Sequence, residues 1–153
     1  MRLNWILATL LTIFLITSCS STDDTISSPA IQAAMDDIEL GSGKAAIVGQ
    51  VVTTASGEPV LLPNTVVRLA KVFWNEDNTD GAFVLEGARS PSDITDEKGV
   101  FVHADLEPAD YVVVVGEVIG IHEIIANPDG SARIFTVEEG EVKYVGIIRV
   151  NLE

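Results

Sequence analysis

From Lys44 onward, short runs of apolar, β-branched residues alternate with clusters of turn-forming residues. The turn clusters are built from glycine, proline, asparagine and aspartate, which make tight bends between extended segments. Valine, isoleucine and threonine favour the pleated, half-buried surface of a sheet. Runs at this spacing, with no βαβ pattern among them, are typical of an all-β sandwich or barrel. The runs that we predict to be strands are 45–53, 65–74, 82–85, 100–104, 111–118, 121–126, 132–137 and 142–152.

Two of these runs suggest their place in a sheet. The run 111–115 is apolar throughout, which predicts a central strand buried on both faces. The last run, 142–152, is long, and at a sheet edge its unpaired backbone groups would be open to another strand. Lys143 and Arg149 within it are the kind of residues that protect an exposed edge.

Glycine, proline and aromatic residues recur in a fixed order over residues 47–115. The order is Gly49-x-Val51, Gly57-Glu58-Pro59, Thr95-Asp96-x-x-Gly99-x-Phe101 and then Leu106-x-Pro108-Ala109-x-Tyr111. It resembles the carboxypeptidase regulatory-like domains, which are prealbumin-like sandwiches related to transthyretin and to the Cna-B-type modules. Two departures are Ala109, where the family usually has glycine, and an insertion over 73–91 that is longer than the family's norm.

The resemblance implies one Ig-like or prealbumin-like β-sandwich of seven to eight strands over residues 44–153. It also implies five fold-defining residues, of which Phe101 and Tyr111 fill the space between the sheets. Family members accompany enzymes, receptors and adhesins as spacers or binding modules, so the resemblance implies no reaction. The five fold-defining residues are Gly49, Pro59, Gly99, Phe101 and Tyr111.

The first 19 residues have the composition of a secretory signal peptide. Arg2 supplies a positive charge, and an apolar stretch over 5–16 follows it. The segment Ile16-Thr17-Ser18-Cys19 resembles the lipobox of bacterial lipoproteins, which implies cleavage before Cys19 and lipidation of its thiol. Several acyl chains at this position give stable membrane anchoring. The alternatives are a plain signal peptide with an unrelated cysteine and an uncleaved anchor.

These features predict a lipid-anchored protein of the cell envelope. Ser20, rather than aspartate, follows the cysteine, which places the protein at the outer membrane of a diderm or at the cell surface of a monoderm. Residues 20–43 are rich in small and polar residues and are interpreted as a flexible tether, with a short helix over 30–40 as the alternative.

The charge of the chain argues against one class of partner. The formal net charge is −14, and it becomes −15 after removal of Arg2, because all 23 acidic residues but only 8 of the 9 basic ones follow Cys19. Such a negative field repels phosphate backbones, so we expect no nucleic-acid partner. A partner protein or a glycan of the envelope is the remaining expectation.

One acidic segment has the spacing of a metal loop. Glu76, Asn78 and Asp80 stand at alternate positions before Gly81, as at the start of a calcium loop. The segment lacks flanking helices, and Gly87 stands where a bidentate glutamate is needed. A solvated acidic loop is therefore the preferred interpretation, and a calcium-binding adhesion module is the alternative function. Trp74, beside this loop, is expected in the core.

No residues form a recognisable catalytic motif. His103 and His122 lie 19 residues apart in predicted strands, a spacing that matches no zinc site. No serine or cysteine is placed near a base by any known motif. We therefore expect surface or rim histidines, no catalytic residues, no cofactor apart from the calcium alternative, and a non-enzymatic binding or structural role.

Overall fold

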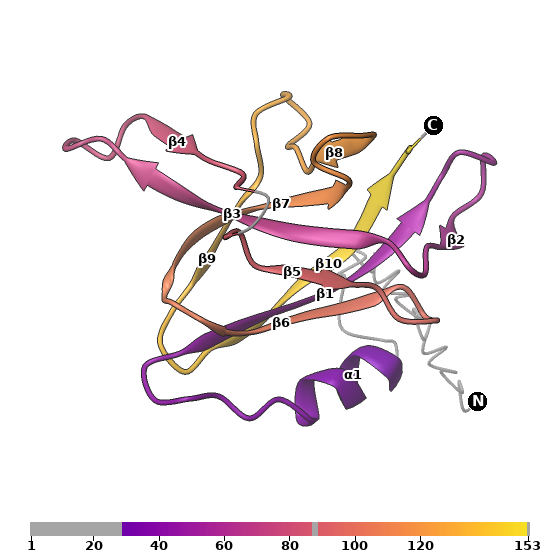
Figure 1. Cartoon of the computed structure of the whole chain (residues 1–153), viewed down its shortest axis with the longest axis horizontal. Helices are drawn as coiled ribbons and strands as arrows, with labels where there is room; N and C mark the ends of the chain where they lie inside the picture. The colour runs from indigo at the N-terminus through magenta and orange to yellow at the C-terminus, as the bar shows by residue number, and fades with distance from the viewer. Residues whose placement is uncertain (1–28, 87–88, 153) are drawn as a thin grey trace, which may run out of the picture.

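The computed structural model describes residues 29–86 and 89–152, which form two β-sheets packed face to face with one helix outside them (Figure 1). This arrangement confirms the predicted all-β sandwich. The elements are α1 (Pro29–Asp36), β1 (Ala45–Thr53), β2 (Val60–Leu61), β3 (Val66–Trp74), β4 (Gly81–Phe83), β5 (Ser92–Ile94), β6 (Val100–Leu106), β7 (Ala109–Gly116), β8 (His122–Ile124), β9 (Ile134–Val137) and β10 (Val142–Val150).

One sheet is built around β1, and the other is built around β3 and β7. In the four-stranded sheet, β1 pairs in parallel with β10 on one side and antiparallel with β6 and β2 on the other. In the six-stranded sheet, β3 and β7 pair with each other, β4 and β5 flank β3, and β8 and β9 flank β7. β7 is buried from Tyr111 to Gly116, which confirms the predicted central strand. β10 has no partner strand other than β1 among the described residues, so it is an edge strand.

The structure has more strands than the seven to eight predicted. All eight predicted runs form strands, and two short ones are added. β2 has two residues and pairs with the end of β1, while β5 has three and pairs with β3. Segments this short carry no readable alternation, because their pairing depends on a neighbouring strand with free backbone groups.

β5 also connects the two sheets. The Oδ2 atom of Asp93 accepts a hydrogen bond from the backbone N–H of Val102 on β6 at 2.8 Å. Next to β5, the buried hydroxyl of Thr95 donates to the carbonyl of Leu62 at 2.7 Å and accepts from the N–H of Thr65 at 2.9 Å. The Asp93 bond satisfies a backbone group of β6, and the Thr95 bonds satisfy backbone groups of the segment between β2 and β3. Because β5 also pairs with β3, it is bonded to both sheets.

The main core lies between the two sheets and is formed by the side chains that their strands direct inward. Phe101 and Tyr111 are buried in it, as strand alternation predicts, with exposed fractions of 0% and 4%. The other predicted fold-defining residues lie in or beside turns and at close contacts. Gly99 has a φ of +72°, a conformation that favours glycine, and a Cβ atom there would stand 2.5 Å from the carbonyl oxygen of Val51. Pro59 is exposed in the turn before β2.

Gly49 is required by the aromatic ring opposite it. It pairs with Phe101 across β1 and β6, and the ring lies over its backbone. A Cβ atom at Gly49 would stand 2.6 Å from two atoms of that ring and 2.8 Å from Cγ2 of Val145. The predicted glycine therefore provides room for the predicted aromatic residue.

We expect Gly49→Ala to lower the free energy of unfolding by about 1–3 kcal/mol, the usual cost of overpacking a core. Chemical denaturation measures this change. The control is Gly41→Ala, because a Cβ there meets only the side chains of Asp105 and Lys44, at 3.2 and 3.3 Å. Combining Gly49→Ala with Phe101→Leu should cost less than the sum of the two single changes. Strict additivity would show that the ring does not cause the effect.

The segment 20–43 is interpreted from the sequence as a flexible tether, but its described part contains the helix α1, which packs on the domain. Ile31 is 1% exposed and packs on Val48 and Val100, on the outer face of the four-stranded sheet. Met35 and Ile38 contact the same cluster. The helix ends at Asp36, short of the predicted Leu40, because two consecutive aspartates are unfavourable at the negative end of a helix. Burial of this apolar face stabilises a helix that would be marginal alone.

Candidate functional site

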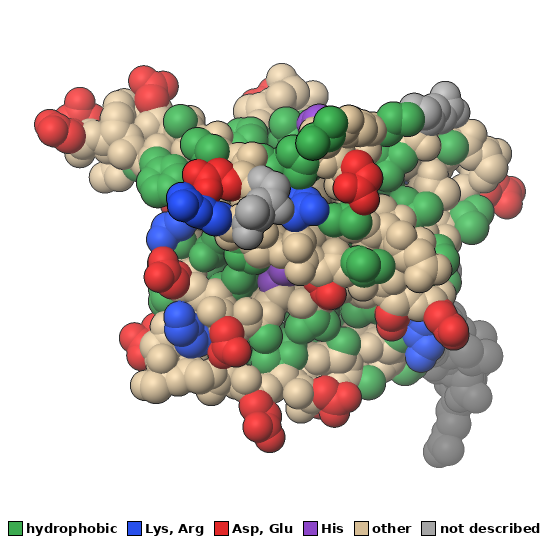
Figure 2. Space-filling view, in the orientation of Figure 1, with side chains coloured by type: hydrophobic (Ala, Val, Ile, Leu, Met, Phe, Trp, Pro, Cys, Tyr) green, Lys and Arg blue, Asp and Glu red, His purple; other side chains and the backbone are tan. Residues whose placement is uncertain are grey.

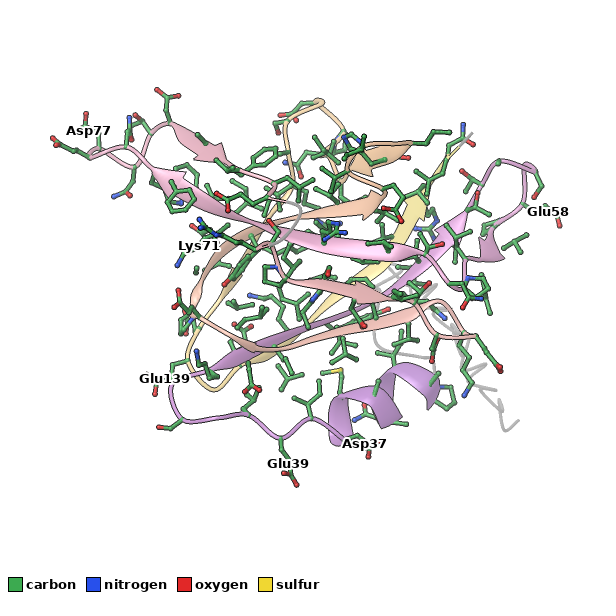
Figure 3. All side chains as sticks on the ribbon, in the orientation of Figure 1. Asp37, Glu39, Glu58, Lys71, Asp77 and Glu139 are labelled. Atoms are coloured by element: carbon green, nitrogen blue, oxygen red, sulfur yellow. The ribbon has the colours of Figure 1, made fainter. Side chains whose placement is uncertain are left out.

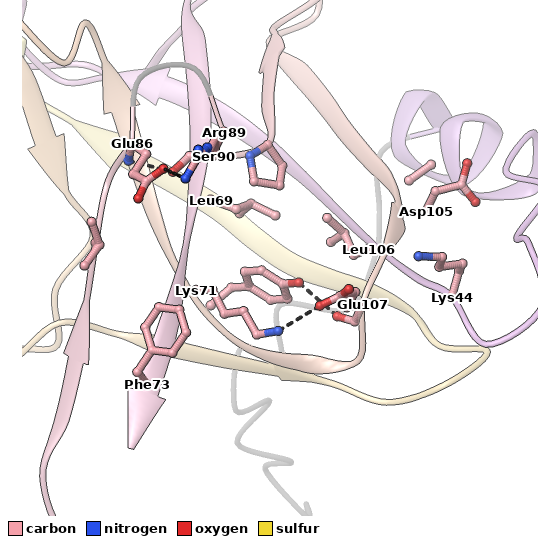
Figure 4. A pocket seen from close by; sticks show the side chains of 14 residues that line it. Lys44, Leu69, Lys71, Phe73, Glu86, Arg89, Ser90, Asp105, Leu106 and Glu107 are labelled. Atoms are coloured by element: carbon pink, nitrogen blue, oxygen red, sulfur yellow. Dashed lines mark hydrogen bonds and ion pairs between the residues drawn. The ribbon is translucent and has the colours of Figure 1, made fainter. Parts of the chain in front are cut away.

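An open groove of about 540 Å³ lies along the inner face of β3, where the sheets separate (Figure 4). This volume is within the usual range for ligand sites. Three core residues, Leu69, Leu106 and Tyr111, form its floor. The remaining lining residues are Lys44, Lys71, Phe73, Val84, Glu86, Arg89, Ser90, Pro91, Ala104, Asp105 and Glu107.

The β3–β4 hairpin forms the apolar wall of the groove. Leu69, Lys71 and Phe73 alternate along β3 and so share one face of the strand. The hairpin extends beyond the end of the sandwich, with Asp77 at its tip (Figures 1 and 3). Its apolar side chains there have no opposite sheet to cover them. Phe73 is consequently 59% exposed and Val84 is 55% exposed.

The opposite wall is the turn between β6 and β7. The Nζ atom of Lys71 lies 2.8 Å from Oε2 of Glu107, and the hydroxyl of Tyr111 donates to the carbonyl of Glu107 at 2.9 Å (Figure 4). The hydrogen bond with Glu107 raises the pKa of Lys71, and the same bond lowers the pKa of Glu107. Burial raises the pKa of Tyr111. All three groups therefore keep their ordinary charge at neutral pH.

The charges of the groove balance one another. Glu86 lies 3.5 Å from Arg89, and its backbone N–H donates to the hydroxyl of Ser90 at 2.9 Å. With Lys44 and Asp105, the lining contains three basic and three acidic side chains. Acidic side chains are spread over the rest of this face of the molecule (Figure 2). The groove is thus a neutral region on a strongly acidic protein.

The predicted calcium residues lie at the tip of the β3–β4 hairpin, and all are exposed. The loop is closed by Asn75, whose Oδ1 accepts from the backbone N–H groups of Thr79 and Asp80 at 2.9 and 3.2 Å. Within residues 29–86 and 89–152, no three or more His, Cys, Asp or Glu side chains are grouped as metal ligands. The calcium site at Glu76, Asn78 and Asp80 stays a prediction.

The expectation of surface or rim histidines is wrong for His103. It is 4% exposed, its ring packs on Phe101 at 5.7 Å between centroids, and its Nε2 has no hydrogen-bond partner among the described residues. Burial lowers its pKa to about 4, against the opposing effects of Asp93 and of the Val67 backbone. It therefore behaves as an uncharged core residue. His122, by contrast, is exposed at the start of β8.

Trp74 also differs from its expected place in the core. It is 38% exposed, and its Nε1 donates to Oδ2 of Asp110 at 2.6 Å. Trp74 follows Phe73 on β3, so the two rings lie on opposite faces of the strand. Cys19 and the rest of the predicted signal peptide lie outside the described residues. In the part of the chain that is described, no helix has the length and apolarity needed to cross a membrane.

The sequence predicted none of the groove. Its walls come from β3, from the β6–β7 turn and from residues 84, 86 and 89–91, and Lys71 and Glu107 are 36 positions apart in the chain. Two signals were present in the sequence. One is the long insertion over 73–91, and the other is Phe73, a large apolar residue at the end of a strand.

No protein-family model and no curated protein sequence matches the chain. The resemblance to the carboxypeptidase regulatory-like domains and the lipobox therefore both stay predictions.

Several solved structures are similar to the chain over most of its length. A candidate carbohydrate-binding protein from Pseudomonas aeruginosa is 18% identical, with a TM-score of 0.47, and the alignment covers 82% of this chain and 98% of that one. A DUF3823 family protein from Bacteroides uniformis is 21% identical, with a TM-score of 0.39, over 73% of this chain and 43% of that one. The dioxygenase domain of a dioxygenase–carbohydrate-binding fusion from a Streptomyces species is 13% identical, with a TM-score of 0.39, over 75% of this chain and 84% of that one. None of these similarities identifies a ligand or a reaction for this chain.

Proposed function

We propose that the chain is a non-catalytic binding module of the cell envelope, anchored by lipid on Cys19, that holds its ligand in the groove beside β3. One observation carries the binding role. Phe73 is a large aromatic side chain that is 59% exposed at the wall of a polar groove, above a floor of core residues. Exposed aromatic groups beside placed polar groups are typical of binding sites.

The rigidity of the groove supports the same function. Its floor belongs to the main core, and Lys71 pairs directly with Tyr111 across β3 and β7. A ligand would therefore meet side chains whose backbone is already fixed, so less conformational entropy is lost on binding. The residues of the groove include carboxylates and amines but no histidine or cysteine. Glu107, whose pKa is lowered by its hydrogen bond with Lys71, is a poor proton donor at neutral pH.

Lipid anchoring is tested by Cys19→Ala, which we expect to release the protein from the membrane fraction. The reason is that the thiol of Cys19 is the only cysteine thiol in the chain and stands at the position a lipobox requires. Fractionation and labelling with a palmitate analogue measure the effect. Ser18→Ala is the control, since it keeps a small residue before the cysteine. A wild-type protein that takes up no label would contradict the anchoring.

The binding role is tested by thermal unfolding of the purified full-length protein in detergent, in the presence of glycan and protein fractions of the envelope. A ligand that binds only the folded state raises the melting temperature. The ligand should be recovered with unchanged mass after long incubation. Chemical conversion of the ligand would contradict the non-catalytic assignment, and the absence of stabilisation by every fraction would contradict the binding role.

A further inference from the structure

We infer that the ligand of the groove is an uncharged oligosaccharide, bound with one sugar ring on Phe73 and its hydroxyl groups on the Lys71–Glu107 pair. This inference rests on the proposed binding function and specifies its ligand. It follows from three properties of the groove: an aromatic face, paired polar groups opposite it, and balanced charge.

The apolar wall fits one face of a sugar ring. Phe73 and Val84 are both more than half exposed, and they adjoin Lys71 on the same side of the hairpin. The face of an aromatic ring is electron-rich, and the C–H groups of a pyranose ring carry a small positive charge, so the two attract when stacked. An apolar peptide side chain could fill the same space, but it would not use the free acceptor positions of Glu107.

The polar wall fits hydroxyl groups. Glu107 accepts from Lys71 at 2.8 Å, yet its side chain is 68% exposed, so its carboxylate has free acceptor positions toward the groove. Lys71 and the hydroxyl of Ser90 add donors. A sugar hydroxyl donates and accepts at once, so it donates to a free acceptor position of Glu107 or accepts from Lys71 while their direct contact stays in place.

The balance of charge selects an uncharged ligand. Three basic side chains of the lining face three acidic ones, and the molecule around them carries a large negative charge. An anionic ligand is repelled by the surrounding field and would have to displace Glu107 from Lys71. A cationic ligand would compete with Lys71 and Arg89 for the carboxylates that these two side chains already neutralise. An uncharged polar ligand meets neither cost.

The experiment measures binding of the full-length protein in detergent to neutral trisaccharides of glucose, mannose and galactose, to trigalacturonic acid and to short peptides. We expect at least one neutral trisaccharide to bind and Phe73→Ala to weaken that binding about tenfold or more. The matched control is Trp74→Ala, a neighbouring exposed aromatic residue on the other face of β3, with an expected change within about twofold. Melting curves check that both variants are folded.

A second pair of variants tests the polar wall. Glu107→Gln should weaken binding about fivefold, because one charge-assisted hydrogen bond is lost. Glu141→Gln is its control, since Glu141 also pairs with a lysine, at 3.0 Å from Lys143, but lies outside the groove. If the uronic acid or a peptide binds, and Phe73→Ala weakens that binding about tenfold, the ligand is not an uncharged oligosaccharide. The groove would still be the binding site. Binding that is insensitive to both Phe73 and Glu107 would overturn the site itself.

Discussion

Phe101→Ala is expected to lower the free energy of unfolding by about 3–5 kcal/mol. The ring is 0% exposed, lies over Gly49 and contacts His103, so its removal leaves a cavity that the two sheets cannot close. A domain of this size has only about 5–15 kcal/mol of stability in total. Chemical denaturation followed by circular dichroism measures the change, and the variant should be largely unfolded at moderate denaturant.

Phe135→Ala is a useful comparison, because this ring is also in the core but is 6% exposed and has Arg133 stacked over it. It should cost less than Phe101→Ala, since the cavity opens toward solvent. If Phe101→Ala proved neutral, the register between β1 and β6 would be wrong, because that register places the ring on Gly49.

The second large effect that we expect is a loss of folding stability at acid pH, caused by His103. In the fold its pKa is about 4, because burial disfavours the charged ring. In the unfolded chain the pKa returns to about 6.5. Between these values the unfolded state binds more protons than the folded state, so stability falls as the pH falls from about 6.5 to about 4. The loss is about 3 kcal/mol once the pH is below both values, and it is absent above about 6.5.

Burial sets the size of this effect, and two neighbouring groups oppose it. Asp93 on β5 favours the protonated ring, and a backbone hydrogen bond with Val67 on β3 acts in the same direction. Both are weaker than the effect of burial. Nε2 has no partner that would stabilise a proton there. The other ring in contact, Phe101, offers no charge.

Two measurements test the role of His103. An NMR titration of the His103 ring should show it remaining neutral through pH 5. Chemical denaturation gives the free energy of unfolding at each pH between 7 and 4. This free energy should fall more in wild type than in His103→Leu, and the difference separates the effect of His103 from that of the carboxylates. His122→Gln is the control and should follow wild type. Titration of His103 near its ordinary pKa would show that it is not buried.

The sequence by itself determined the all-β class, eight of the ten described strands and the inward direction of Phe101 and Tyr111. These are local properties, because side chains of a strand alternate between two faces and glycine marks the turns. The same alternation places His103 on the face of Phe101, but we expected it at the surface because histidine is polar. The helix over Pro29–Asp36 was readable as a pattern, whereas its contact with Val48 and Val100 was not.

Only the tertiary structure decided where the groove lies and what lines it. Phe73, Glu86 and Glu107 come from three separate segments, and they meet because the β3–β4 hairpin extends past the sheets while the β6–β7 turn closes opposite it. The short strand β5 likewise depends on free backbone groups that β3 and β6 provide. Contacts between segments far apart in the chain depend on how the sheets stack, and strand alternation fixes only which face each side chain occupies.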